Sequence, residues 1–185
     1  GDISNWDTSN VSDMRSLFAG ASTFNGDISE WNTSSVTNMP VMFNGALAFN
    51  QDISTWNVSN VTDMSGMFEI ASAFNQDIGS WNVSNVTRVS TMFYNATSFN
   101  QDIGAWDVSS VVNMSSMFVN ASSFNQDISE WCVANIVSEP SEFSLDSPLS
   151  ESNKPVWGTC PIQPPITNAN IQTAVDLWVS DPAAA

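Results

Sequence analysis

The chain has 185 residues, with nineteen Asp and Glu residues against three Lys and Arg residues, no histidine and a formal net charge of −16 at pH 7. So acidic a surface repels nucleic-acid phosphates and anionic lipid head groups, which excludes both as partners. Hydrophobic residues make up 42% of the chain. No apolar run reaches the roughly 18 residues of a membrane span, so we expect a folded chain without membrane insertion.

A repeated unit of twenty-five residues runs from residue 1 to about residue 143. Six copies align without gaps on the Trp column, which comprises Trp6, Trp31, Trp56, Trp81, Trp106 and Trp131. An Ile column (Ile3, Ile28, Ile53, Ile78, Ile103 and Ile128) and a Phe column (Phe18, Phe43, Phe68, Phe93, Phe118 and Phe143) keep the same spacing. Such units stack into a solenoid. Residues 1–6, GDISNW, match the middle of a unit, so we expect repeat sequence upstream of them.

Each unit predicts one strand and one helix. Residues 53–58, ISTWNV, are β-tolerant and predict a short strand. Met64, Met67, Phe68 and Ala71 have the i, i+3, i+4, i+7 spacing of one helix face. The predicted fold class is therefore α/β, a leucine-rich-repeat-like solenoid of six coils, with short parallel strands on one side and short helices on the other.

Two end positions of the predicted helix follow the same logic. Thr62 is its predicted N-cap. Pro40 and Pro140 share one column and fall in its first turn, where a missing N–H is harmless.

Recurring residues within the coils are interpreted first as structure. The Trp column is predicted to be core, with a carbohydrate-stacking platform as the alternative. An Asn column (Asn25, Asn50, Asn75, Asn100 and Asn125) is predicted to hydrogen-bond neighbouring coils as buried amides. An Asp column (Asp2, Asp27, Asp52, Asp77, Asp102 and Asp127) needs compensation by backbone N–H groups. Bound Ca²⁺ is the alternative there, and otherwise no cofactor and no metal site is expected.

The pattern FNQDISxWxVSxVTxMxxMF resembles the BspA-like leucine-rich-repeat surface proteins of bacteria and microalgae over residues 1–143. The resemblance implies an extracellular, non-catalytic solenoid used in adhesion or surface architecture. The sequence departs from the pattern at Val89, Val112 and Glu139, so the sixth copy is expected to be a fading, terminal coil.

Cys132 and Cys160 flank the end of the last unit and predict a disulfide in an oxidising compartment, with two free thiols as the alternative. Residues 144–165 are predicted to form a disulfide-pinned cap and a Pro-rich connector.

Residues 166–185 are similar to the segment that often precedes the first repeat in the BspA-like family. Their apolar residues have helical spacing and predict an amphipathic helix with Ile171, Ala174, Val175, Trp178 and Val179 on one face. We expect this helix to cap the first coil of the next module or subunit, at Ile3 and Trp6, in a head-to-tail array or filament. Folding back onto its own solenoid is the alternative.

Nine Asn-x-Ser/Thr sequons follow the repeat and predict N-glycans if the source is a secretory eukaryote. They are Asn10, Asn32, Asn57, Asn60, Asn82, Asn85, Asn95, Asn113 and Asn120.

Without histidine, and with one Tyr, the sequence offers no catalytic constellation, so an enzyme is not expected. The function predicted is a structural or adhesive extracellular glycoprotein module, with identical modules as partners. The alternative is a solenoid that binds a protein or polysaccharide at a cell surface, which an exposed aromatic patch would favour.

Overall fold

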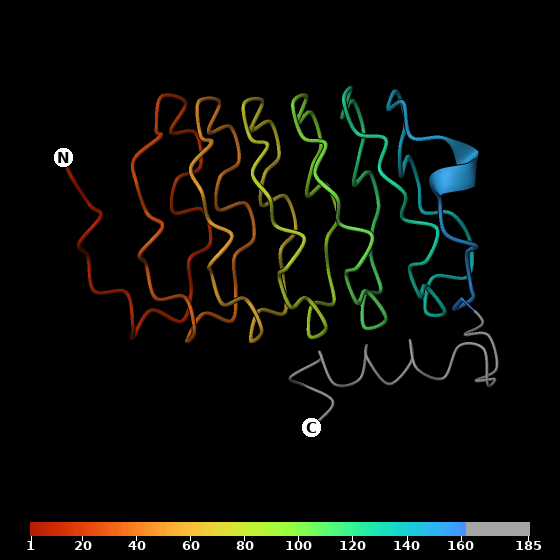
Figure 1. The fold of residues 1–185 in the computed structure, drawn as a ribbon, viewed down its shortest axis with the longest axis horizontal. Helices are drawn as coiled ribbons and strands as arrows, with labels where there is room; N and C mark the ends of the chain where they lie inside the picture. The colour runs from red at the N-terminus through yellow and green to blue at the C-terminus, as the bar shows by residue number, and fades with distance from the viewer. Residues whose placement is uncertain (162–185) are drawn as a thin grey trace, which may run out of the picture.

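The structure is a computed structural model, and it describes residues 1–161. The chain winds in successive coils that stack along one axis, from the first residues to the cap (Figure 1). The one helical element among the described residues is the 3₁₀ helix η1, Glu151–Asn153. Four isolated parallel bridges join residues 13, 38, 63, 88 and 113 in sequence. The stacked repeat is therefore present, but the predicted α/β architecture of strands and helices is wrong. No helix in the described part is long and apolar enough to span a bilayer.

Backbone hydrogen bonding explains why the predicted helix does not form. Within residues 64–71, every second N–H donates to the next coil, as Met64 does to Arg88 O and Phe68 to Met92 O. The N–H groups of Met67, Glu69 and Ala71 close i to i−3 turns, as Met67 does to Met64 O, and the Ser65 N–H donates to Asp63 Oδ1. Two positions per coil have positive φ, here Gly66 at 61° and Ile70 at 58°. Apolar residues at helical spacing therefore face inward from a series of turns that share their hydrogen bonds with the next coil.

The predicted strand is also replaced by turns. The Trp56 N–H donates to Ile53 O and the Val61 N–H donates to Val58 O, so the chain turns twice within this stretch. Thr62, the predicted helix cap, donates its N–H to Thr37 O of the preceding coil instead. The isolated bridges lie next to this position, on the side of the coil that was predicted to be helical.

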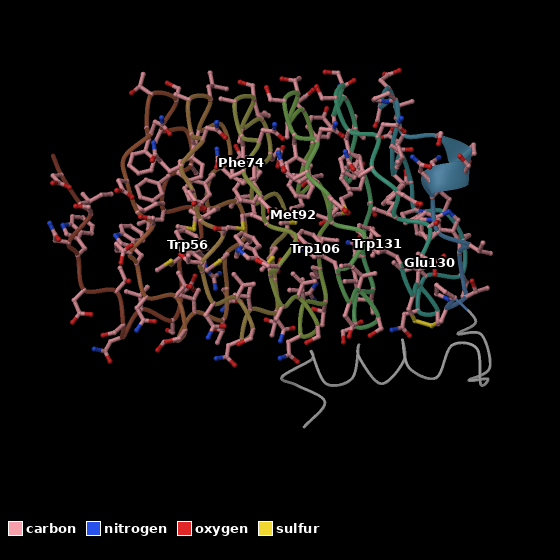
Figure 2. The ribbon with its side chains drawn as sticks, in the orientation of Figure 1. Trp56, Phe74, Met92, Trp106, Glu130 and Trp131 are labelled. Atoms are coloured by element: carbon pink, nitrogen blue, oxygen red, sulfur yellow. A yellow bond between two sulfur atoms is a disulfide. The ribbon has the colours of Figure 1, made fainter. Side chains whose placement is uncertain are left out.

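The core is a set of ladders along the rod axis (Figure 2). The five Trp residues from Trp31 to Trp131 are 1% to 4% exposed, and each indole N–H donates to an Ile carbonyl 28 residues earlier, at 3.0 to 3.1 Å. Phe rings stack between coils, with Phe43 and Phe68 at 5.6 Å and 2°. The prediction that the Trp column is core is confirmed for these five residues.

In the sixth coil, the alignment of the sequence with the coil positions shifts by one residue. Positive-φ residues recur every twenty-five residues up to Ser116 and Asn120, but the next pair is Glu142 and Asp146, twenty-six later. The Phe118 N–H donates to Phe143 O, whereas Phe93 donates to Met117 O. Phe143 thus occupies the position that Met117 and Met92 hold in the earlier coils. Its predicted position in the Phe column is wrong.

The slip has a physical reason. Unslipped, Glu142 would enter the buried Met column, whereas the slip leaves it exposed and buries Phe143 instead. Pro140 moves by one place as well, so the predicted shared column of Pro40 and Pro140 is also wrong.

Candidate functional site: the two ends of the coil stack

The first coil presents an apolar end face, which we call the N-terminal face. Trp6 is 59% exposed and Leu17 is 46% exposed. Ile3, Phe18 and Phe24 are partly buried and pack against the core from one side only. Residues at the equivalent places in the second coil are 0% to 4% exposed. Core positions are therefore presented to solvent at this end, where the sequence predicted Ile3 and Trp6 as contacts.

The N-terminal face also carries a row of backbone acceptors. In the interior of the stack, Val41, Phe43 and Gly45 donate their N–H groups to Ser65, Met67 and Glu69 O at 2.8 to 2.9 Å. The matching carbonyls of the first coil belong to Arg15, Leu17 and Ala19, and no donor within residues 1–161 reaches them. The face is thus an open hydrogen-bonding edge with acceptors on alternate residues.

The sixth coil presents the complementary row, on what we call the C-terminal face. By their place in the ladder, the N–H groups of Glu142, Ser144 and Asp146 point onward along the rod, and they have no acceptor within the described residues. A cavity of about 390 Å³ lies beside this row, lined by Phe143, Leu149 and several acidic side chains. Sequence reasoning missed both rows, because it assigned these N–H groups to a helix.

Residues 149–161 cover the other half of the sixth coil as a further half-coil. The Ile128 N–H donates to Asn153 O at 2.9 Å and the Val133 N–H donates to Thr159 O at 2.8 Å. Asn153 Nδ2 contacts Asn125 O at 3.1 Å, which repeats the bond that Gln126 makes to Asn100. The described part of the predicted cap therefore imitates the start of a seventh coil.

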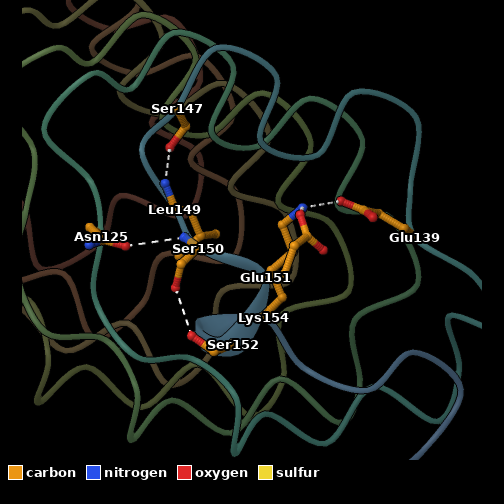
Figure 3. A network of polar contacts seen from close by, with 8 residues as sticks. All are labelled: Asn125, Glu139, Ser147, Leu149, Ser150, Glu151, Ser152 and Lys154. Carbon is orange, nitrogen blue, oxygen red and sulfur yellow. Dashed lines mark hydrogen bonds and ion pairs between the residues drawn. The ribbon is translucent and has the colours of Figure 1, made fainter.

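A buried lysine fastens the half-coil (Figure 3). The Lys154 side chain is 9% exposed, and its Nζ lies 2.8 Å from Glu139 and 2.7 Å from Glu151. Burial alone would lower the pKa of Lys154, but the bonds to Glu139 and Glu151 outweigh it and raise the pKa. The lysine is therefore held charged between the sixth coil and η1.

A disulfide joins Cys132 to Cys160, with the Cα atoms 3.9 Å apart. It links the sixth coil to the end of the half-coil, as the spacing of the two cysteines predicted. Residues 162–185 are outside the described residues, and with them the predicted connector end and the predicted contacts of Ile171, Ala174, Val175, Trp178 and Val179.

The Asp column is compensated by the backbone, as predicted. Each Asp accepts the N–H of the residue two positions later, as Asp52 Oδ1 does from Ser54 and Asp77 Oδ1 from Gly79, both at 2.9 Å. Side-chain and backbone hydrogen bonds from Ser54 lower the pKa of Asp52, and equivalent bonds lower the pKa of Asp27. No group of three or more His, Cys, Asp or Glu residues in the described part is placed to hold a metal ion.

The Asn column links coils but is not buried. Asn75 Oδ1 accepts the Asn100 N–H at 2.9 Å and Gln101 Nε2 at 3.0 Å. The same bond joins Asn25 to Asn50 and Asn50 to Asn75. Asn75 is half-buried and the others are exposed, so the predicted bonding is confirmed and the predicted burial is wrong.

The flanks carry the sequons and few exposed aromatics. Seven of the nine sequon asparagines are exposed, while Asn95 and Asn120 are half-buried. Because the later Trp residues of the column are buried, they form no stacking platform on the surface. The aromatic patch expected for a ligand-binding solenoid is not found on the flanks of residues 1–161.

Comparison with known families finds a family model that matches the repeat region twice. A family model described as "Mycoplasma protein of unknown function, DUF285" matches residues 1–97 and, in a second overlapping match, residues 77–155. No curated protein and no solved structure matches the chain. The matched residues are the repeat coils and the start of the half-coil, so the repeated unit carries the family likeness.

Proposed function

Since the chain belongs to the family of repeat proteins described as Mycoplasma protein of unknown function, DUF285, we propose that it is a non-catalytic extracellular structural or adhesive glycoprotein module. Identical modules or subunits assemble head-to-tail into a surface fibre or matrix. The resemblance to BspA-like surface proteins and the disulfide between Cys132 and Cys160 support an extracellular location. The observation that carries the proposal is the complementarity of the two end faces.

Apolar area favours covering the N-terminal face. Trp6, Leu17 and Phe18 hold core positions, and burying such side chains is favourable by roughly 25 cal/mol per Å² of apolar surface removed from water. An exposed apolar end of a solenoid needs a cap or a further repeat. Another module supplies such a surface.

Hydrogen-bond direction selects the orientation of the partner. Two N-terminal faces in contact would set carbonyls against carbonyls, and two C-terminal faces would set N–H groups against N–H groups. Buried polar groups without partners cost about 1–3 kcal/mol each, so both symmetric pairings are disfavoured. The N-terminal face of one module and the C-terminal face of the next carry opposite rows. A heterologous contact that repeats along the rod axis does not close into a ring and generates a filament.

The half-coil sets the spacing at the junction. Residues 149–161 already occupy one layer above the sixth coil on their side of the rod. When the next module rests on this half-coil, the donor row of Glu142 to Asp146 and the acceptor row of Arg15 to Ala19 stand two layers apart. A further segment must therefore cover the first coil at the junction. In this proposal that segment is the helix expected at residues 166–185, which lie outside the described residues, with the apolar set from Ile171 to Val179 on its covering face.

A matched pair of surface substitutions tests the proposal. Leu17 lies on the N-terminal face and is 46% exposed, and Leu47 lies on the flank of the stack and is 44% exposed. We expect the purified chain to form rods that lengthen with concentration in electron micrographs. Leu17→Glu abolishes these rods and Leu47→Glu leaves them. Monomers at all concentrations, or equal effects of the two substitutions, contradict the proposal.

A further inference from the structure

Two sequons in the repeated string WNVSNVT differ in how the fold uses their side-chain nitrogen. The string occurs at residues 56–62 and at 81–87, with sequons at Asn57 and Asn60 and at Asn82 and Asn85. All four asparagines are exposed, so exposure does not separate them. Their hydrogen bonds do.

The first asparagine of each pair binds through its oxygen. Asn57 Oδ1 accepts the Ser59 N–H at 3.1 Å and the Ser59 hydroxyl at 2.7 Å. Asn82 does the same with Ser84, at 3.2 and 2.7 Å. Asn32, at the same place one coil earlier, follows with Ser34 at 3.1 and 2.7 Å. The oxygen is held in place, and no acceptor within the described residues binds Nδ2.

The second asparagine binds through its nitrogen. Asn60 Nδ2 donates to Ser34 O at 2.8 Å, and Asn85 Nδ2 donates to Ser59 O at 2.8 Å. Each acceptor lies in the preceding coil, 26 residues earlier in the chain. These nitrogens are therefore part of the contact between coils.

Among these five asparagines, we propose that Asn32, Asn57 and Asn82 bear glycans and that Asn60 and Asn85 stay bare. This inference rests on the proposed function as a secreted glycoprotein. In the modification, an oligosaccharide passes from a lipid-linked pyrophosphate donor to Nδ2. The bond from sugar C1 to the pyrophosphate oxygen breaks, the N-glycosidic bond forms, and the lipid pyrophosphate and one amide proton leave. On Asn57 the sugar displaces no hydrogen bond, whereas on Asn60 it crowds an atom 2.8 Å from the neighbouring coil.

Spacing limits how many glycans one rod carries. Asn32, Asn57 and Asn82 lie in consecutive coils, and neighbouring coils are about 4.8 Å apart. Glycans on adjacent coils compete for room, so no single molecule is expected to carry all three. The sugar then forms one discontinuous stripe along the rod and leaves the end faces clear for assembly.

Glycopeptide mapping of the full chain, secreted from eukaryotic cells, tests the inference. Release by a peptide N-glycosidase in ¹⁸O water marks each occupied asparagine by mass. We expect label at Asn32, Asn57 and Asn82 but not at Asn60 or Asn85, and we expect Asn60→Gln to leave this pattern unchanged. Label on Asn60 or Asn85 equal to that on Asn57 overturns the sorting alone. A secreted product without any glycan overturns the glycoprotein proposal as well.

A second measurement follows the hydrogen bonds without sugar. Asn60→Asp removes the nitrogen that binds Ser34, whereas Asn57→Asp keeps the acceptor oxygen, as Asp7 does with Ser9 at 2.6 Å. In unglycosylated protein, we expect Asn60→Asp to lower the unfolding midpoint by about 2–4 °C and Asn57→Asp to change it by less than about 1 °C. Equal shifts contradict the assignment of the two nitrogens.

Discussion

The two ends of the coil stack treat the same repeated columns in different ways. At the N-terminal face, Trp6 and Leu17 are exposed at positions that are core elsewhere. At the other end the sequence departs from the repeat: Phe143 slips into the Met column, Pro140 supplies no N–H, and a half-coil is fastened by Lys154 and the disulfide. The contrast is that the sixth coil departs from the repeat where the half-coil covers it, whereas the first coil keeps the contact positions of the inner coils, which we propose a further layer covers.

Substituting the same column at the end and in the middle should give the largest difference. Trp81→Ala empties a buried site and loses the indole bond to Ile53 O. We expect a cost of about 3–5 kcal/mol in the free energy of unfolding. Trp6→Ala, at the exposed end, should cost less than about 1 kcal/mol for the isolated chain. Urea unfolding measures both, and similar costs would mean that Trp6 is covered in solution.

Removing the disulfide should affect one end only. We expect the double variant Cys132→Ser and Cys160→Ser to lose about 2–4 kcal/mol. Hydrogen exchange should quicken in residues 147–161 and stay unchanged in coils two to four, because coils contact only their neighbours. Uniform loss of hydrogen-exchange protection along the stack would show that the disulfide stabilises the whole stack and not the half-coil alone.

The Asn column offers a smaller effect within the stack. Asn75→Ala removes the acceptor of the Asn100 N–H and should cost about 1 kcal/mol. Asn5→Ala is the control, since Asn5 is exposed in the first coil and makes no hydrogen bond with the described residues. Chemical unfolding measures the free energy of unfolding of both variants. An equal loss for Asn5→Ala and Asn75→Ala would contradict a stabilising role of the Asn bonds between coils.

Lowering the pH should produce the smallest change in stability, through the Asp column that runs along the flank of all six coils. The bonds from Ser29, Ser54 and Ser129 lower the pKa of Asp27, Asp52 and Asp127. Their stabilising contribution is therefore present above the unfolded pKa of about 4 and is lost as pH falls through the lowered folded pKa.

The triple variant Asp27→Asn, Asp52→Asn and Asp127→Asn keeps the acceptor oxygens without the titration. Between pH 5 and about pH 2, the native chain should lose more stability than this variant. Thermal unfolding across this range measures the difference. A difference that does not change with pH contradicts the role of these bonds.

The sequence predicted the stack, the Trp core, the compensation of the Asp column and the pairing of the cysteines, because each follows from side chains that recur at one spacing. The helix prediction failed at Met64, Met67 and Phe68, since inward spacing does not reveal where a backbone N–H points. Here every second N–H donates to a carbonyl of the next coil, twenty-four residues later in the chain, and such distant contacts cannot be inferred from local spacing. The shift at Phe143 was missed because the copies were aligned without gaps, and that alignment places Glu142 in the buried Met column, where a carboxylate is unfavourable. The two open rows followed from neither composition nor spacing.

Directional cross-linking tests head-to-tail assembly most directly. A chain with Leu17→Cys and Val175→Cys, mildly oxidised and run on a non-reducing gel, should give a ladder of covalent oligomers. Neither single variant should give such a ladder. A cross-link within one molecule, or dimers of the Leu17→Cys variant alone, would contradict the account.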